Sequence, residues 1–136
     1  MKNVFLIFIS LGLILTACSK EEEVTEEQLI DLTGEWTGNG YECPKGTFHD
    51  EIVDITHDLS TGVFAATKIT GDDCVLAGEI TFSGNFDGKE KSLRMNAIGG
   101  SAADPSSVRV NGTMVIINSD SFSATALGTT VQFVRN

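Results

Sequence analysis

The chain has 136 residues, 41% of them hydrophobic, and its 19 acidic and 9 basic side chains give a formal net charge of −10. Once a leader is set aside, this length corresponds to one domain of common size. The acidic balance and the lack of any basic cluster in the sequence argue against nucleic acid as a partner.

Residues 1–17 have the layout of a signal peptide, in which Lys2 precedes an almost wholly apolar run at 4–15. A membrane-spanning helix needs about 20 apolar residues, so this run is too short to span. It ends in Leu-Thr-Ala-Cys at 15–18, which resembles the lipobox of bacterial lipoproteins. The resemblance implies that residues 1–17 are removed and that Cys18 is lipidated and holds the protein on a membrane. An ordinary secretory signal with an incidental cysteine is the alternative.

Residues 18–33 are expected to form a disordered, lipidated tether. The Ser-Lys-Glu-Glu-Glu run at 19–23 is charged and self-repelling, so it cannot build a core. It resembles the acidic export signal that Bacteroidota place after the lipidated cysteine of surface lipoproteins. The resemblance implies an outer-membrane protein exposed at the cell surface, whereas the alternative is a merely solvated linker.

From residue 34 to 136 the chain alternates short runs of β-type residues with Gly, Asp, Asn or Pro about every ten positions, which is typical of an all-β domain. Eight antiparallel strands are expected, and eight suit a closed up-and-down barrel. They cover residues 35–41, 48–56, 62–70, 77–86, 91–98, 108–117, 121–127 and 129–135. In the fourth strand, alternation places Ile80, Phe82 and Phe86 together on one face.

The first strand opens with Gly34, Glu35 and Trp36, which resembles the Gly-x-Trp start of lipocalins, avidins and other small eight-stranded barrels. In those families the Trp closes the narrow end and a late Arg packs across its ring. The resemblance implies a lipocalin-like barrel closed by Trp36 and Arg135, a contact that contributes about 0.5 to 2 kcal/mol. A ligand platform at Trp36 is the alternative.

Residues 66–79 resemble the Thr-Lys-Ile-Thr-Gly-Asp-x-x-Val-Pro-Ala-Gly signature of the cyclin-D1-binding domain of F-box proteins, a barrel that receives peptide segments. This chain departs from the signature at Asp73, Cys74 and Leu76, so the resemblance implies a shared barrel but no shared substrate. At a barrel rim, Lys68 and Asp72 would grip the charged or amide end of a ligand. The favoured alternative is surface pairing for Lys68 and a turn hydrogen bond for Asp72.

With Cys18 assigned to lipid, Cys43 and Cys74 remain as an even pair in an exported chain, which predicts a disulfide. The bond closes a loop of about 30 residues and contributes roughly 3 to 4 kcal/mol in the chain-entropy model. Residues 41–46 also resemble the Tyr-x-Cys-x-x-Gly opening of membrane-bound lysozyme inhibitors.

The sequence predicts no metal site, cofactor or catalytic group. The candidate metal ligands that lie close together in the sequence are His49, Asp50, Glu51, His57 and Asp58. On one strand the two histidines would lie about 26 Å apart, too far to share an ion. We expect both to be solvated surface residues. No nucleophile motif occurs in the sequence.

The function expected is non-catalytic binding of a small apolar ligand or a peptide segment. The alternative is enzyme inhibition through a presented loop at 43–47 or 99–107. If it is not such a loop, the segment at 99–107 is either a flap over the barrel mouth or a plain linker. The sequence leaves the oligomeric state open.

Overall fold

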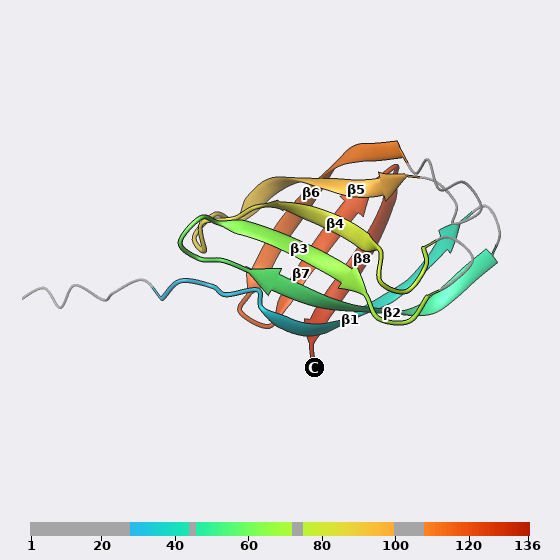
Figure 1. Cartoon of the computed structure of the whole chain (residues 1–136), viewed down its shortest axis with the longest axis horizontal. Helices are drawn as coiled ribbons and strands as arrows, with labels where there is room; N and C mark the ends of the chain where they lie inside the picture. Colours follow the sequence, from blue (N-terminus) through green and yellow to red (C-terminus); the bar gives the residue numbers. More distant parts are fainter. Residues whose placement is uncertain (1–27, 44–45, 72–74, 100–107) are drawn as a thin grey trace, which may run out of the picture.

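The computed structural model describes residues 28–43, 46–71, 75–99 and 108–136. Within them, eight antiparallel strands close into a barrel in which each strand pairs with the next along the chain and β8 returns to β1 (Figure 1). The strands are β1 (Gly34–Cys43), β2 (Gly46–His57), β3 (Val63–Lys68), β4 (Ile80–Asn85), β5 (Ser92–Gly99), β6 (Val108–Asn118), β7 (Ser121–Ala126) and β8 (Thr129–Arg135). The same residues contain no helix long and apolar enough to cross a membrane. The predicted all-β, eight-stranded up-and-down barrel is confirmed.

The largest departure from the predicted strand boundaries lies between β3 and β4. Residues 69–70 were expected in the third strand and residues 77–79 in the fourth, but β3 ends at Lys68 and β4 begins at Ile80. Gly78 has a φ of +86°, a left-handed conformation that ends a regular strand. The connection nevertheless stays bonded to β3, because the Gly78 N–H donates to the Lys68 carbonyl at 2.8 Å and the Lys68 N–H donates to the Glu79 carbonyl at 2.9 Å.

A β-bulge in β4 overturns one predicted face. Ala66 of β3 pairs with Phe82, but Thr67 pairs with Ile80, so Thr81 is an extra residue in the ladder. An extra residue shifts the inward and outward alternation by one. Ile80 is therefore exposed while Thr81 is buried, and the prediction that Ile80 shares the inner face of Phe82 is wrong.

The core lies inside the barrel and is rich in aromatic rings. Phe122 stacks on Phe133 with ring centroids 4.9 Å apart and meets the edge of Trp36 at 4.8 Å. Glycine makes room where an aromatic ring packs against the backbone of a neighbouring strand. A Cβ on Gly84 would lie 2.9 Å from Cε1 of Phe64, closer than real Cβ atoms approach. The buried interior thus combines large rings with positions that tolerate no side chain.

The two ends of the barrel differ. At one end, which we call the tryptophan end, residues 28–33 enter the barrel beside Trp36, Arg135 and the β2–β3, β4–β5 and β6–β7 turns (Figure 1). At the other, which we call the lysine end, lie Lys68 and Glu51. The last residues of β1, β3, β5 and β7 and the first residues of β2, β4, β6 and β8 lie at this end.

Candidate functional site

Arg135 and Trp36 close the tryptophan end. The Arg135 guanidinium carbon lies 4.3 Å from the centroid of the Trp36 ring, the arrangement that the Gly-x-Trp resemblance implies. Its Nη1 donates to the Thr33 carbonyl at 2.7 Å and its Nη2 to the Asp31 carbonyl at 2.6 Å. The Trp36 indole donates to the Leu32 carbonyl at 2.8 Å, and its side chain is fully buried. Because no face of the ring is open, these contacts serve closure and leave no ligand platform.

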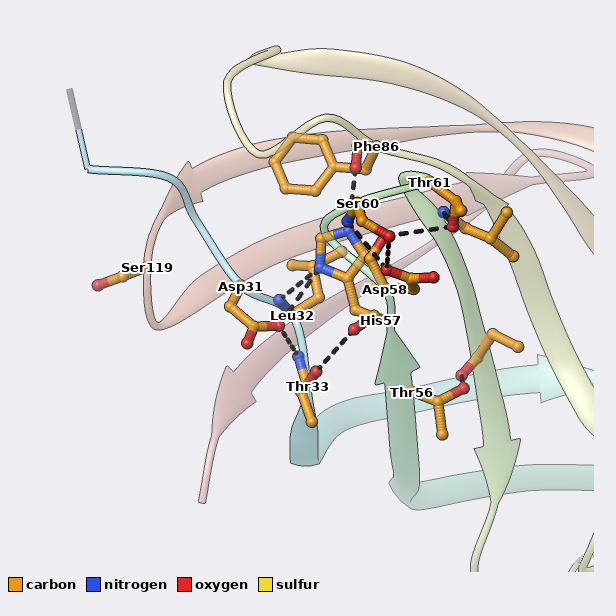
Figure 2. Close-up of polar contacts among 12 residues, drawn as sticks. Asp31, Leu32, Thr33, Thr56, His57, Asp58, Ser60, Thr61, Phe86 and Ser119 are labelled. Atoms are coloured by element: carbon orange, nitrogen blue, oxygen red, sulfur yellow. Dashed lines mark hydrogen bonds and ion pairs between the residues drawn. The ribbon is translucent and has the colours of Figure 1, made fainter. Parts of the chain in front are cut away.

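His57 also holds the tryptophan end together, through hydrogen bonds to the incoming segment and to the β4–β5 turn (Figure 2). Its ring nitrogen Nδ1 accepts the Leu32 N–H at 3.1 Å, and Nε2 lies 2.9 Å from the Phe86 carbonyl, to which it donates in the neutral Nε2–H tautomer. The ring stacks on Phe86 with centroids 5.6 Å apart, and its exposed fraction is 0%. The prediction of a solvated surface histidine is wrong for His57, because the incoming segment at 28–33 covers it. The side chain of His49 lies outside the described residues.

Carboxylates with displaced pKa values lie in turns and in the incoming segment at the tryptophan end. The Thr33 N–H lowers the pKa of Asp31. Hydrogen bonds from Ser60 lower the pKa of Asp58, and the Lys89 N–H lowers that of Asp87. Each is a carboxylate held charged by nearby donors, which fixes a turn rather than providing a general acid or base.

The buried polar residues of the described chain gather at the lysine end. They are Glu51 of β2, Lys68 of β3 and Thr81 of β4, with exposed fractions of 4%, 1% and 8%. We call these three residues the polar layer. The Lys68 ammonium donates to the Glu51 carboxylate, and both side chains are buried. Lys68 lies on the opposite face from Thr67, as alternation predicts. That face is the interior of the barrel, so the prediction that Lys68 pairs on the surface is wrong.

Strand alternation and a glycine on the neighbouring strand explain how the Glu51 side chain fits inside the barrel. Glu51 continues the inward row of Val53 and Ile55 along β2. Gly38 of β1 stands directly opposite Glu51, and a Cβ there would lie 3.1 Å from the Glu51 Cβ and 2.6 Å from Val131 Cγ1. The glycine therefore makes room for the carboxylate side chain on one side and for Val131 on the other.

Thr81 completes the polar layer through the bulge. Since Ile80 pairs with Thr67, which faces outward, the next residue turns inward. The Thr81 Oγ1 is buried, and no hydrogen-bond partner for it occurs in the described part of the chain. A buried hydroxyl without a partner is uncommon in folded proteins and calls for an explanation.

The opposite wall of the lysine end is apolar and only partly buried. Val110 of β6, Ala126 of β7 and Val131 of β8 pack against the core but retain some exposure. A charged pair and an unpaired hydroxyl thus lie on one wall, and partly exposed apolar side chains lie on the other. This arrangement suits a ligand with one polar end and one apolar end.

The described residues contain no group of three or more His, Cys, Asp or Glu side chains that could hold a metal ion. Of the residues singled out from the sequence, Cys18, Asp72 and Cys74 lie outside the described ranges, as does the side chain of Cys43. The sequence indicates Glu51 only as a possible metal ligand, and nothing in it singles out Thr81. No model of a known protein family and no curated protein sequence matches this chain.

Proposed function

We propose that this chain is a lipoprotein of the outer membrane, exposed at the cell surface, whose barrel binds a small apolar ligand without catalysing a reaction. The lysine end is the binding end. The observation that carries this proposal is the ion pair of Glu51 and Lys68 inside the barrel. Apolar side chains of similar volume often stabilise a core as well as a buried ion pair does, or better, so a role in recognition accounts for charges at this position.

The shape of the fold supports the same end. Eight-stranded barrels leave room for side chains or for one small ligand. At the tryptophan end that space is taken by Leu32, Trp36 and the Arg135 contacts. At the lysine end, Val110, Ala126 and Val131 face inward and keep partial exposure, which provides apolar surface for a ligand.

The anchor proposed at Cys18 fits this direction of binding. Residues 28–33 join the barrel at the tryptophan end (Figure 1). The tether therefore attaches at the end opposite to the polar layer. Binding at the lysine end leaves the anchor undisturbed, and a ligand is taken up from the aqueous side.

Native mass spectrometry tests the binding. The full chain, purified from the membranes of its own host and released from detergent in the spectrometer, should carry an additional small molecule that organic extraction recovers. A matched Cys18→Ser chain should lose membrane association, whereas Cys43→Ser should retain it. Protein without any bound molecule, together with failure to bind any apolar probe at the lysine end, would refute the binding function.

An interaction function is the second candidate, and the β1–β2 hairpin favours it. Beyond Gly38, β1 loses its pairing with β8, yet it stays paired with β2 as far as Cys43 opposite Gly46. The hairpin therefore extends past its neighbours at the lysine end (Figure 1). A projecting hairpin suits either insertion into a lysozyme- or protease-type enzyme or pairing with a peptide segment. Deleting residues 44–45 should abolish such binding and leave small-ligand binding in place.

A further inference from the structure

The charges of the polar layer restrict the class of ligand. Glu51 and Lys68 are in direct contact and both are buried, so each charge already has an opposite charge beside it. A ligand carboxylate would compete with Glu51 for Lys68 and leave a buried carboxylate without its counter-charge. A ligand ammonium would do the same to Lys68. Both cases are costly, because a charge buried without an opposite charge loses its hydration and gains no ion pair to offset that loss.

Thr81 supplies what a neutral group needs. Its hydroxyl can donate one hydrogen bond and accept two, and its Oγ1 is buried without a partner among the described residues. The backbone N–H of Lys68 donates to the Glu79 carbonyl at 2.9 Å, which fixes the start of β4 beside the end of β3. Thr81 therefore turns inward next to the strand that carries Lys68. A ligand atom that pairs with its hydroxyl recovers a hydrogen bond that folding leaves unmade.

We propose that the lysine end binds an apolar ligand with a neutral hydrogen-bonding head group, a hydroxyl or a carbonyl, and does not bind ionised amphiphiles. Thr81 holds the head group. Val110, Ala126 and Val131, on the strands across the barrel from β2–β4, cover the apolar part. This inference rests on the proposed function, since it names the ligand class of the same end.

Three probes that share one alkyl chain test the head group: 1-octanol, octanoate and octylammonium. The full-length protein is held in phospholipid nanodiscs at pH 7, and the NMR signals of the Val110, Ala126 and Val131 methyl groups are followed during titration. Methyl signals report binding inside the barrel and ignore probe that partitions into lipid. Octanol should perturb them at roughly tenfold lower concentration than either ion, a difference of about 1.4 kcal/mol.

The outcomes separate this inference from the proposed function. Octanoate or octylammonium binding as tightly as octanol overturns the neutral head group but leaves a binding barrel. If no probe perturbs the three methyl signals and the native protein carries no ligand, both proposals fall.

The variant Thr81→Val separates recognition from folding. It keeps the shape of the side chain and removes the unpaired hydroxyl, so its melting temperature should equal or exceed that of the parent. Its affinity for octanol should fall about 2- to 10-fold, the effect of one neutral hydrogen bond. The control Thr113→Val, at an exposed position on β6, should change neither quantity. A lower melting temperature with unchanged octanol affinity would overturn the assignment, because it would mean that the hydroxyl is a structural group satisfied by water.

Discussion

Replacing Lys68 by Met should destabilise the barrel strongly, because it removes the ammonium that pairs with the buried Glu51 carboxylate. The exposed fractions of the two side chains are 1% for Lys68 and 6% for Glu51, so water cannot take the place of the lost partner. Breaking a pair buried to this degree costs about 3 to 5 kcal/mol. A domain of this size has roughly 5 to 15 kcal/mol of stability in total. The single substitution should therefore remove a large share of it and lower the melting temperature by roughly 12 to 25 °C.

The double variant Glu51→Leu with Lys68→Met provides the matched comparison. With both charges gone, neither charge of the pair is left inside without the other, and the free energy of unfolding should return to within about 1 kcal/mol of the parent or exceed it. The coupling energy of the cycle should be about 3 kcal/mol or more. Trp36 is the single tryptophan of the chain and lies at the opposite end of the barrel, so its fluorescence reports urea unfolding without being touched by either change.

Two results would refute this reasoning. If Lys68→Met alone stays within about 1 kcal/mol of the parent, water reaches the pair and the interior is not as dry as the burial indicates. If the double variant is as unstable as the single one, the loss comes from packing of the lysine stem and not from the unpaired carboxylate.

Three further predictions concern the rest of the molecule. Arg135→Met should lower the free energy of unfolding by about 1 to 3 kcal/mol and change the emission of Trp36, because it removes charge-assisted hydrogen bonds and a cation on the ring; an unchanged urea midpoint would contradict the closing role. The backbone N–H of Thr33 lowers the pKa of Asp31, so the stabilising contribution of this carboxylate is complete above its ordinary pKa of 3.8 and is lost as the pH falls through the lower pKa of the folded state. The urea midpoints of the parent and Asp31→Asn should therefore converge from pH 5 to pH 2, and a constant gap would argue against the shift. Peptide mapping without reductant should find Cys43 linked to Cys74, and free thiols at both positions in the mature protein would disprove the disulfide.

The sequence predicted the strands well because most of them satisfy two independent signals. In β6, for example, Met114 and Ile116 alternate with exposed residues, and Asn118 leads into a turn that the residue types alone indicate. The same alternation failed at Ile80, because a bulge adds one residue without any mark in the composition. Thr81 was missed for that reason. Its inward position depends on register, which a single strand does not encode.

His57 shows a second limit of sequence reasoning. A histidine at the end of a strand, next to a polar turn, has the pattern of a solvated residue. Its burial comes from residues 28–33, which were expected to be tether but cover the tryptophan end. A short segment without periodicity carries no signal of what it will pack against, so neither partner could be identified before the structure.

The ion pair, in contrast, left a signal in the sequence that alternation could have found. Glu51 stands two residues before Val53 in the inward row of β2, and Lys68 stands two after Ala66 in that of β3. Since neighbouring strands joined by a hairpin run antiparallel, the start of one inward row lies beside the end of the next, and the observed register places Val53 opposite Lys68. Glu51 and Lys68 are then diagonal neighbours on the inner face, within reach of two long side chains of opposite charge. An inward position is costly for either charge alone and tolerable for both together, so the pattern of two opposite charges on adjacent inward rows predicts a buried pair rather than two surface residues.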